Sequence, residues 1–351
     1  MSRMQKSART GLAATASALL LAVAAGCSSD DGDSGSTASE DGGSLVLITP
    51  TPIGSNNFLA LARDGAEAAG AANDAAVDVY ESTDPASIQQ NIDAAVRDGV
   101  DIVIGVSFSV QDQFATSAVD NPDQQFLLID ACPPEQPENL TCAVFREHES
   151  NYLAGVEAGL LTQTGAVGAV AALDDPFIHR WIDPFFAGAQ SVNPAVTTSV
   201  QYVGGDNPFG DTPRAKAQAE IVAGTGADHI NAAASGGNPG VFEAAAENGV
   251  FAFGVDTNQC PEQPGTVVDN SIKRVDVALE SAVEEILGGD AGGNKSYGLA
   301  EDGVGLTGLQ EGVEDSQCVI ADHPDVLEQV AAVRDQIIAG DIVVEDPVAA
   351  G

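Results

Sequence analysis

Six apolar segments of this chain are each followed by small polar residues, glycine and an occasional aromatic residue. The following segments read TPTPIGSNNF after Ile48, GVSF after Ile104, a single Asp130 after Ile129, LDDPFIHRW after Ala172, AAASGGNPG after Asn231 and GVD after Phe253. Each one leads into a predicted helix, where unpaired backbone N–H groups can hold a ligand. The sequence has no GxSxG segment, no Walker A segment and no GxGxxG after the first strand. The pattern therefore indicates ligand binding without a cofactor, rather than catalysis.

The chain alternates between apolar segments and stretches of helical periodicity. The predicted strands are Leu45–Ile48, Val77–Tyr80, Ile102–Ile104, Phe126–Ile129, Ala166–Ala172, Val196–Val203, His229–Asn231 and Val250–Phe253. The predicted helices are Phe58–Ala69, one capped by Asp84 and ended by Gly99, one that ends at Val119, and those near Phe185–Val192, Pro213–Ala223 and Val241–Glu247. Mostly apolar strands joined by helices predict an α/β fold whose parallel sheet is covered on both faces. Such sheets bind ligands beyond the carboxyl ends of their strands.

The first 27 residues have the pattern of a bacterial lipoprotein signal. Three basic residues precede an apolar run from Gly11 to Ala25, which is too short for a confident membrane span. The run ends in VAAGC, which resembles a lipobox. We expect removal of residues 1–26 and diacylation of Cys27, for example with palmitate. An ordinary secretion signal with an incidental Cys27 is the alternative. Residues 27–44 carry almost no apolar side chain and predict a flexible acidic tether.

The chain is strongly acidic, with 13 Lys and Arg against 52 Asp and Glu. Loss of the signal removes three basic residues and no acidic one, so the mature charge is 10 − 52 = −42. This charge repels nucleic acid and anionic membrane surfaces, so we expect membrane attachment only through the lipid. The acidic residues are spread along the chain and favour an adaptation to solubility or salt over a cation site. The Asp174-Asp175 doublet does not match an EF-hand loop.

Four cysteines remain after Cys27, and an even number in an exported protein predicts two disulfides. Three pairings are possible. Cys132 and Cys142 flank the Pro-rich segment PPEQPENLT, so a local bridge is the simplest pairing and leaves Cys260 with Cys318. No Cys or His spacing predicts a zinc site.

The segment FREHESNYLAGVEAGLLTQTGAVGAVAAL resembles the most recognisable block of the basic membrane protein family. These are bacterial lipoproteins, several of which bind purine nucleosides for ABC importers. Further similar blocks occur in family order from Leu45 to about Leu306: GSNNFLALARDG, GVSF, FLLID, WIDPFFAGAQ, SGGNPGVF, GVDTNQ and DNSIKRV. The resemblance thus covers nearly the whole mature chain.

The resemblance implies a type I periplasmic-binding-protein fold, in which two doubly wound α/β lobes are joined by three crossovers. We expect residues 45–146 with about 256–290 in lobe 1, and residues 147–255 with about 291–351 in lobe 2. The first crossover is expected near Phe145–Glu149 and the second near Val255–Asp256. The third lies late in the chain at a position that the sequence does not fix. Closing lobes would bury a ligand between them.

The resemblance also implies a ligand set. In nucleoside-binding relatives the base lies between two aromatic rings, at positions that correspond here to Phe58 and Trp181. Asp130 corresponds to an acceptor at the base edge, Asp256 to a residue that binds ribose hydroxyls and Lys273 to a lysine at the sugar end. The remaining candidates are Phe108 on a strand-end loop, Asn57 before the stacking ring, and Gly236 and Gly237, which allow close backbone approach. The alternative roles are core aromatics, capping aspartates, a solvated lysine and ordinary loop glycines.

The first loop departs from the family pattern. It lacks the acidic pair of relatives, and Leu59 stands where an asparagine follows the stacking ring, so Asn56 or Asn57 is expected to compensate. The favoured function is a monomeric, lipid-anchored, extracytoplasmic receptor that delivers a nucleoside, with a purine favoured, to an ABC permease. A sensory receptor on the same scaffold is the alternative, as is a binding protein for another flat or sugar-like ligand.

Overall fold

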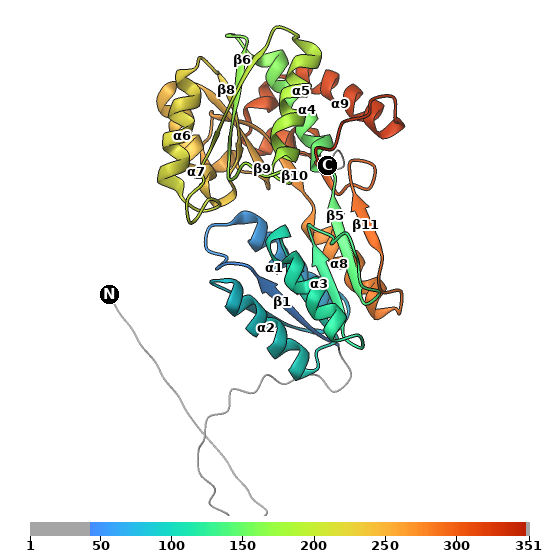
Figure 1. The fold of residues 1–351 in the computed structure, drawn as a ribbon. Coiled ribbons are helices and arrows are strands. Elements are labelled where there is room, and N and C mark those ends of the chain that lie inside the picture. Colours follow the sequence, from blue (N-terminus) through green and yellow to red (C-terminus); the bar gives the residue numbers. More distant parts are fainter. Residues whose placement is uncertain (1–42, 349–351) are drawn as a thin grey trace, which may run out of the picture. The chain divides into compact units, whose positions relative to one another are not determined.

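The structure is a computed structural model that describes residues 43–348 (Figure 1). The predicted signal sequence, the predicted lipidation site Cys27 and nearly all of the predicted tether lie outside the described residues. Within this range no helix combines the length and the apolar character needed to cross a bilayer.

The first sheet contains six parallel strands in the order β11-β5-β4-β3-β1-β2. Its strands are β1 (Ser44–Thr49), β2 (Ala76–Glu81), β3 (Ile102–Val106), β4 (Gln125–Ile129), β5 (Leu140–Phe145) and β11 (Asn294–Tyr297). Its helices are α1 (Asn57–Ala72), α2 (Pro85–Asp98), α3 (Gln111–Asp120) and α8 (Val275–Leu287), and α8 packs against α1. We call this sheet with its helices the first lobe.

The second sheet also contains six strands, in the order β12-β10-β9-β8-β6-β7. They are β6 (Ala166–Ala171), β7 (Thr197–Tyr202), β8 (His229–Ala233), β9 (Phe251–Asp256), β10 (Val267–Lys273) and β12 (Val304–Leu306). Only β12 is antiparallel to its neighbour among these described strands. The helices are α4 (Glu147–Leu161), α5 (His179–Val192), α6 (Thr212–Gly224), α7 (Asn238–Asn248) and α9 (Pro324–Ala339), and they complete the second lobe.

Local sequence signals explain these elements. Every residue of β3 is buried, as expected for a β-branched strand that is covered on both faces. Asp84 caps α2 by accepting from the backbone N–H of Ser87, and Gly99 ends the helix at φ 72°. The predicted α/β fold, the alternation of its elements and the predicted cap of α2 are thereby confirmed.

The chain passes between the sheets three times: between β5 and α4, between β10 and α8, and between β11 and β12. The second passage follows Lys273, whereas the sequence predicted it near Val255–Asp256. The difference arises because β10 stays in the second sheet, where Asn270 pairs with Gly254 of β9. The residues from about 256 to Lys273, which were expected in lobe 1, therefore lie in the second lobe. β11 was expected in lobe 2 but lies in the first lobe, because the chain returns to the second lobe only after Tyr297.

Candidate ligand-binding site

A cavity of about 740 Å³ is lined by loops at the carboxyl ends of strands from both sheets. The lining comes from the segments after β1, β2, β3, β4, β6, β7 and β8 and from the last residues of β9 and β10. It includes seven of the residues expected from the sequence: Phe58, Phe108, Asp130, Trp181, Gly236, Asp256 and Lys273. Residues that lie far apart in the sequence therefore meet at one site, as parallel α/β sheets predict.

Two expected residues, Asn57 and Gly237, are not part of the lining. The amide of Asn57 donates to Glu262 Oε1 at 3.2 Å. Gly237 is packed so closely that an added Cβ would lie 3.2 Å from the Cβ of Ala215. Asn56 lines the cavity instead, and its Oδ1 accepts from the Ser235 hydroxyl at 3.0 Å and from the N–H of Leu59 at 3.1 Å.

Four non-glycine residues of the lining have a positive φ angle: Ser107 at 93°, Asp130 at 81°, Ser235 at 52° and Asp256 at 70°. A left-handed backbone costs a residue with a Cβ roughly 1–3 kcal/mol, and such strain persists where the surrounding structure enforces it. It is concentrated in functional sites. Its repetition at four strand ends around one cavity indicates that these loops are shaped for a ligand.

Lys273 lies at the centre of the charged part of the site, and its side chain is only 3% exposed. Its ammonium group lies 2.6 Å from Asp130 Oδ1, with which it forms a hydrogen bond, and 2.8 Å from Glu147 Oε1. The contact with Glu147 is a close ion pair whose angles do not meet those of a hydrogen bond. Burial lowers the pKa of Lys273, but Asp130, Glu147 and Asp256 outweigh this effect and raise it. The lysine therefore stays charged.

The two buried aspartates of the cavity hold their protons more tightly than exposed aspartates do. Burial raises the pKa of Asp130 to about 7, against the opposing effect of Lys273 and with a further increase from Glu147. Burial also raises the pKa of Asp256 to about 6, again opposed by Lys273. Near neutral pH, both groups can thus present carboxylate oxygens to hydrogen-bond donors of a ligand.

Aromatic rings form the apolar walls. The ammonium group of Lys273 lies 4.9 Å from the ring centroid of Phe58 and 4.7 Å from that of Trp181, within the range of cation–π attraction. Phe58 belongs to α1 and Trp181 to α5, so each lobe supplies one of these rings. Phe108 from the first lobe stacks on Phe177 from the second, with centroids 4.8 Å apart.

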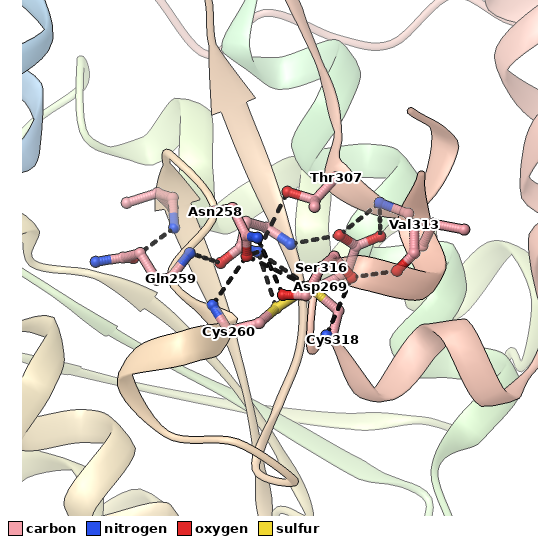
Figure 2. The surroundings of a disulfide bond; sticks show 11 residues. Asn258, Gln259, Cys260, Asp269, Thr307, Val313, Ser316 and Cys318 are labelled. Carbon is pink, nitrogen blue, oxygen red and sulfur yellow. Dashed lines mark hydrogen bonds between the residues drawn. A yellow bond between two sulfur atoms is a disulfide. The ribbon is translucent and has the colours of Figure 1, made fainter. Parts of the chain in front are cut away.

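The loop after Asp256 is braced by the disulfide between Cys260 and Cys318 (Figure 2). Gln259, next to Cys260, accepts from the backbone N–H of Val255 at 3.0 Å and thereby ties the loop to the residue before Asp256. Asn258 donates to the carbonyl of Ser316 at 3.0 Å on the other side of the bridge. The second bridge joins Cys132 to Cys142. Both pairings expected from the sequence are present.

Several residues of the site were not expected from the sequence. Phe177 and Phe209 line the cavity. Glu147 and Arg180 do not line it, but Glu147 pairs with Lys273 and Arg180 lies 3.5 Å from Glu147. A signal existed for Arg180, which directly precedes Trp181, and for Glu147, which lies inside the recognisable FREHES segment. Neither signal indicates that the side chains of Arg180 and Glu147 are buried and paired.

The arrangement supplies flat apolar surfaces, two buried carboxylate acceptors and a buried cation, which together suit a flat ligand with several donors. Within residues 43–348 no group of three or more His, Cys, Asp or Glu side chains is placed to hold a metal ion.

Known proteins are similar to this chain over most of its length. The family model described as "ABC transporter substrate-binding protein PnrA-like" matches residues 44–345. The "CD4+ T-cell-stimulating antigen" of Listeria innocua is 32% identical over 92% of this chain and 94% of its own. The "ABC transporter nucleoside-binding protein BmpA" of Lactococcus lactis is 30% identical over 76% of this chain and 78% of its own.

A solved structure of an ABC transporter solute-binding protein from Aeropyrum pernix matches with a TM-score of 0.76 and 28% identity. The match covers 86% of this chain and 94% of that chain. Together with the two-sheet topology, it confirms the expected type I periplasmic-binding-protein fold.

Proposed function

Because the chain belongs to the Bmp family of PnrA-like ABC transporter substrate-binding proteins, we propose that it binds a nucleoside, with a purine favoured, and delivers it to an ABC permease. A relative named as a nucleoside-binding protein supports this ligand class. We further infer that the protein is a binding protein rather than an enzyme, and that a lipid on Cys27 holds it at the outer face of the cell membrane.

The observation that carries the ligand proposal is the combination of Phe58 and Trp181 with Asp130 and Asp256 around one cavity. Two aromatic rings suit the faces of a base, and stacking on one ring is worth roughly 1–3 kcal/mol per base. Asp130 suits the N–H donors of a purine edge. Asp256 suits the two hydroxyls of ribose, since a hydrogen bond to a charged group is worth roughly 1.5–3 kcal/mol.

The test is binding of adenosine, guanosine, inosine and their free bases, measured by calorimetry and by the fluorescence of Trp181, the only tryptophan of the chain. Asp256→Ala should weaken nucleosides by roughly 10- to 100-fold and free bases much less, because only nucleosides carry the diol. Asp206→Ala is the matched control, since Asp206 also lines the cavity but has no assigned contact with ribose. Equal losses for nucleoside and base would contradict the role of Asp256. Binding of sugars and of no nucleoside would overturn the ligand class.

The lipid anchor is tested separately. Cys27→Ser removes the thiol that would carry the lipid, and the protein should shift from the membrane fraction to the medium or periplasm. Mass spectrometry of the wild-type N-terminal peptide should show a diacylated cysteine. A variant that stays with the membranes at the wild-type level would contradict the anchor.

A further inference from the structure

We propose that Asp346, in the C-terminal segment after α9, is a positioning residue for the cavity: it holds Arg180 and thereby leaves Glu147 free to pair with Lys273. The effect on ligand binding rests on the proposed function. The effect on the charges of Lys273, Glu147 and Asp130 does not rest on the proposed function, so the two effects can be tested separately.

The Arg180–Asp346 pair is the strong contact of this arginine. Arg180 Nε donates to Asp346 Oδ1 at 2.9 Å and Nη2 donates to Oδ2 at 2.8 Å, which is the two-pronged geometry of strong arginine–carboxylate pairs. The two side chains are 13% and 21% exposed, so solvent screens them only partly. Arg180 also lies 5.6 Å from the ring centroid of Phe177 in the cavity wall.

The contact of Arg180 with Glu147 is much weaker. Nη1 of Arg180 lies 3.5 Å from Glu147 Oε2 and 3.4 Å from the carbonyl of Phe145, both near the outer limit of a hydrogen bond. Glu147 instead lies closest to Lys273, at 2.8 Å. The buried Glu147 thus lies between the cations of Arg180 and Lys273, and Asp346 is the main partner of Arg180.

Loss of the Asp346 charge would leave Arg180 partly buried without its main partner, which is costly. Glu147 is the carboxylate within reach that can replace it. When the Glu147 carboxylate moves from Lys273 to Arg180, Asp130 becomes the main ion-pair partner of Lys273. The charged groups that act on Asp130 are Lys273, Glu147, Asp256 and Arg180, so this change favours the ionised form of Asp130 and lowers its pKa.

Trp181 reports on this change without any ligand, because its ring lies 4.7 Å from Lys273 Nζ. In the ligand-free mature protein, the fluorescence of Trp181 should change as Asp130 titrates near pH 7. His148, whose Nδ1 lies 4.0 Å from Asp346, has its pKa lowered by burial and should titrate at a lower pH.

The experiment compares five variants by this pH titration. Asp346→Asn should lower the midpoint by roughly 0.5–1 pH unit. Glu345→Gln removes the same charge from an exposed neighbour and should leave the midpoint unchanged. Arg180→Gln frees Glu147 for Lys273 and should raise the midpoint. The double variant R180Q/D346N removes the whole pair and should return the midpoint towards the wild-type value.

An unchanged midpoint in D346N, or an equal shift in E345Q, would overturn the proposal. If D346N does not fold, the proposal is supported when R180Q raises the titration midpoint and the double variant cancels this rise. The proposal is contradicted when R180Q does not raise the midpoint or the double variant does not cancel the rise. A shifted midpoint with no nucleoside binding in any variant would leave the positioning role intact and remove the proposed ligand. Asp346→Glu should restore the wild-type midpoint, since it keeps the carboxylate.

Discussion

At the scale of single residues, Lys273 links the chemistry of the site to its stability. One buried ammonium group faces three carboxylates and lies near the rings of both lobes. A buried charge is tolerated only when it is paired, and each carboxylate here depends on the same cation. The protonation of Asp130 and Asp256 is therefore set by Lys273 as well as by burial.

These raised pKa values predict a pH dependence of ligand affinity. If a ligand donates a hydrogen bond to ionised Asp130, binding favours the ionised form. Ligand affinity is therefore highest above about pH 7 and falls as the pH drops through this value. The loss can reach about tenfold per pH unit, and Asp256, with its pKa raised to about 6, should add to it below pH 6. Calorimetric titrations from pH 5 to pH 8.5 test this. Asp130→Asn should remove the step near pH 7, and an unchanged step in that variant would assign it elsewhere.

Seven of the nine candidate binding residues named from the sequence line the cavity, because a family motif fixes a residue's place relative to its loop. Asn56 or Asn57 was expected to compensate for the departure of the first loop from the family pattern, and Asn57 was named among the candidates. Only Asn56 lines the cavity, where it caps α1 and contacts Ser235, and two adjacent asparagines look alike in sequence. Asp346 could not be predicted as a partner of Arg180. A contact between a helix start and a distant tail leaves no local pattern.

At the scale of elements, most strands with an apolar pattern were predicted, whereas β5, β10, β11 and β12 were not. The polar strand β10 shows one reason. Asp269, Asn270, Ser271 and Lys273 are all buried within β10, so the strand reads as a polar loop. These polar groups are satisfied by partners from other elements, for example Asp269 by the backbone N–H of Gly308. Because β10 was missed, the expected second crossover lay too early in the chain.

The two disulfides close loops of different length, so they should contribute unequally to the free energy of unfolding. Cys260 and Cys318 are 58 residues apart, and Cys132 and Cys142 are 10 apart. Restriction of the unfolded chain is worth about 4 kcal/mol for the longer loop and about 3 kcal/mol for the shorter one. Replacing Cys260 and Cys318 together by Ala should therefore lower the free energy of unfolding more than replacing Cys132 and Cys142 together.

Urea unfolding of the two double variants measures this difference. Peptide mapping without reductant should first show both bridges in the wild-type protein. The Cys260 and Cys318 variant should also weaken ligand binding, because the loop that it frees holds Gln259 against Val255. Free thiols at all four positions, or the reverse order of stability losses, would contradict the assignment.

At the scale of the whole described molecule, two lobes are connected only by three short passages, and charged pairs lie at these passages. Arg146 pairs with Glu149 at 2.7 Å beside the first, and Arg274 pairs with Asp276 at 3.1 Å beside the second. The side chains that contact one another across the cavity are few: Lys273 with Asp130 and Phe58, Phe108 with Phe177 and Phe209, Asn56 with Ser235, and Asn57 with Glu262. So few contacts should hold the lobes together only weakly when no ligand adds its own.

Phe108→Ala should therefore shift the ligand-free protein towards an open state. The ring centroids of Phe108 lie 4.8 Å from Phe177 and 6.4 Å from Phe209, and each aromatic pair is worth roughly 0.5–1.5 kcal/mol. Losing both pairs would change the ratio of closed to open molecules by roughly 5- to 150-fold.

Distances between spin labels at the exposed positions Val119 in α3 and Ile221 in α6 measure this ratio. Phe251→Ala is the control, because Phe251 stacks on His229 within the second lobe. The distances should lengthen in F108A and not in F251A, and saturating ligand should shorten them again. Equal distributions in the two variants would mean that Phe108 does not hold the lobes together.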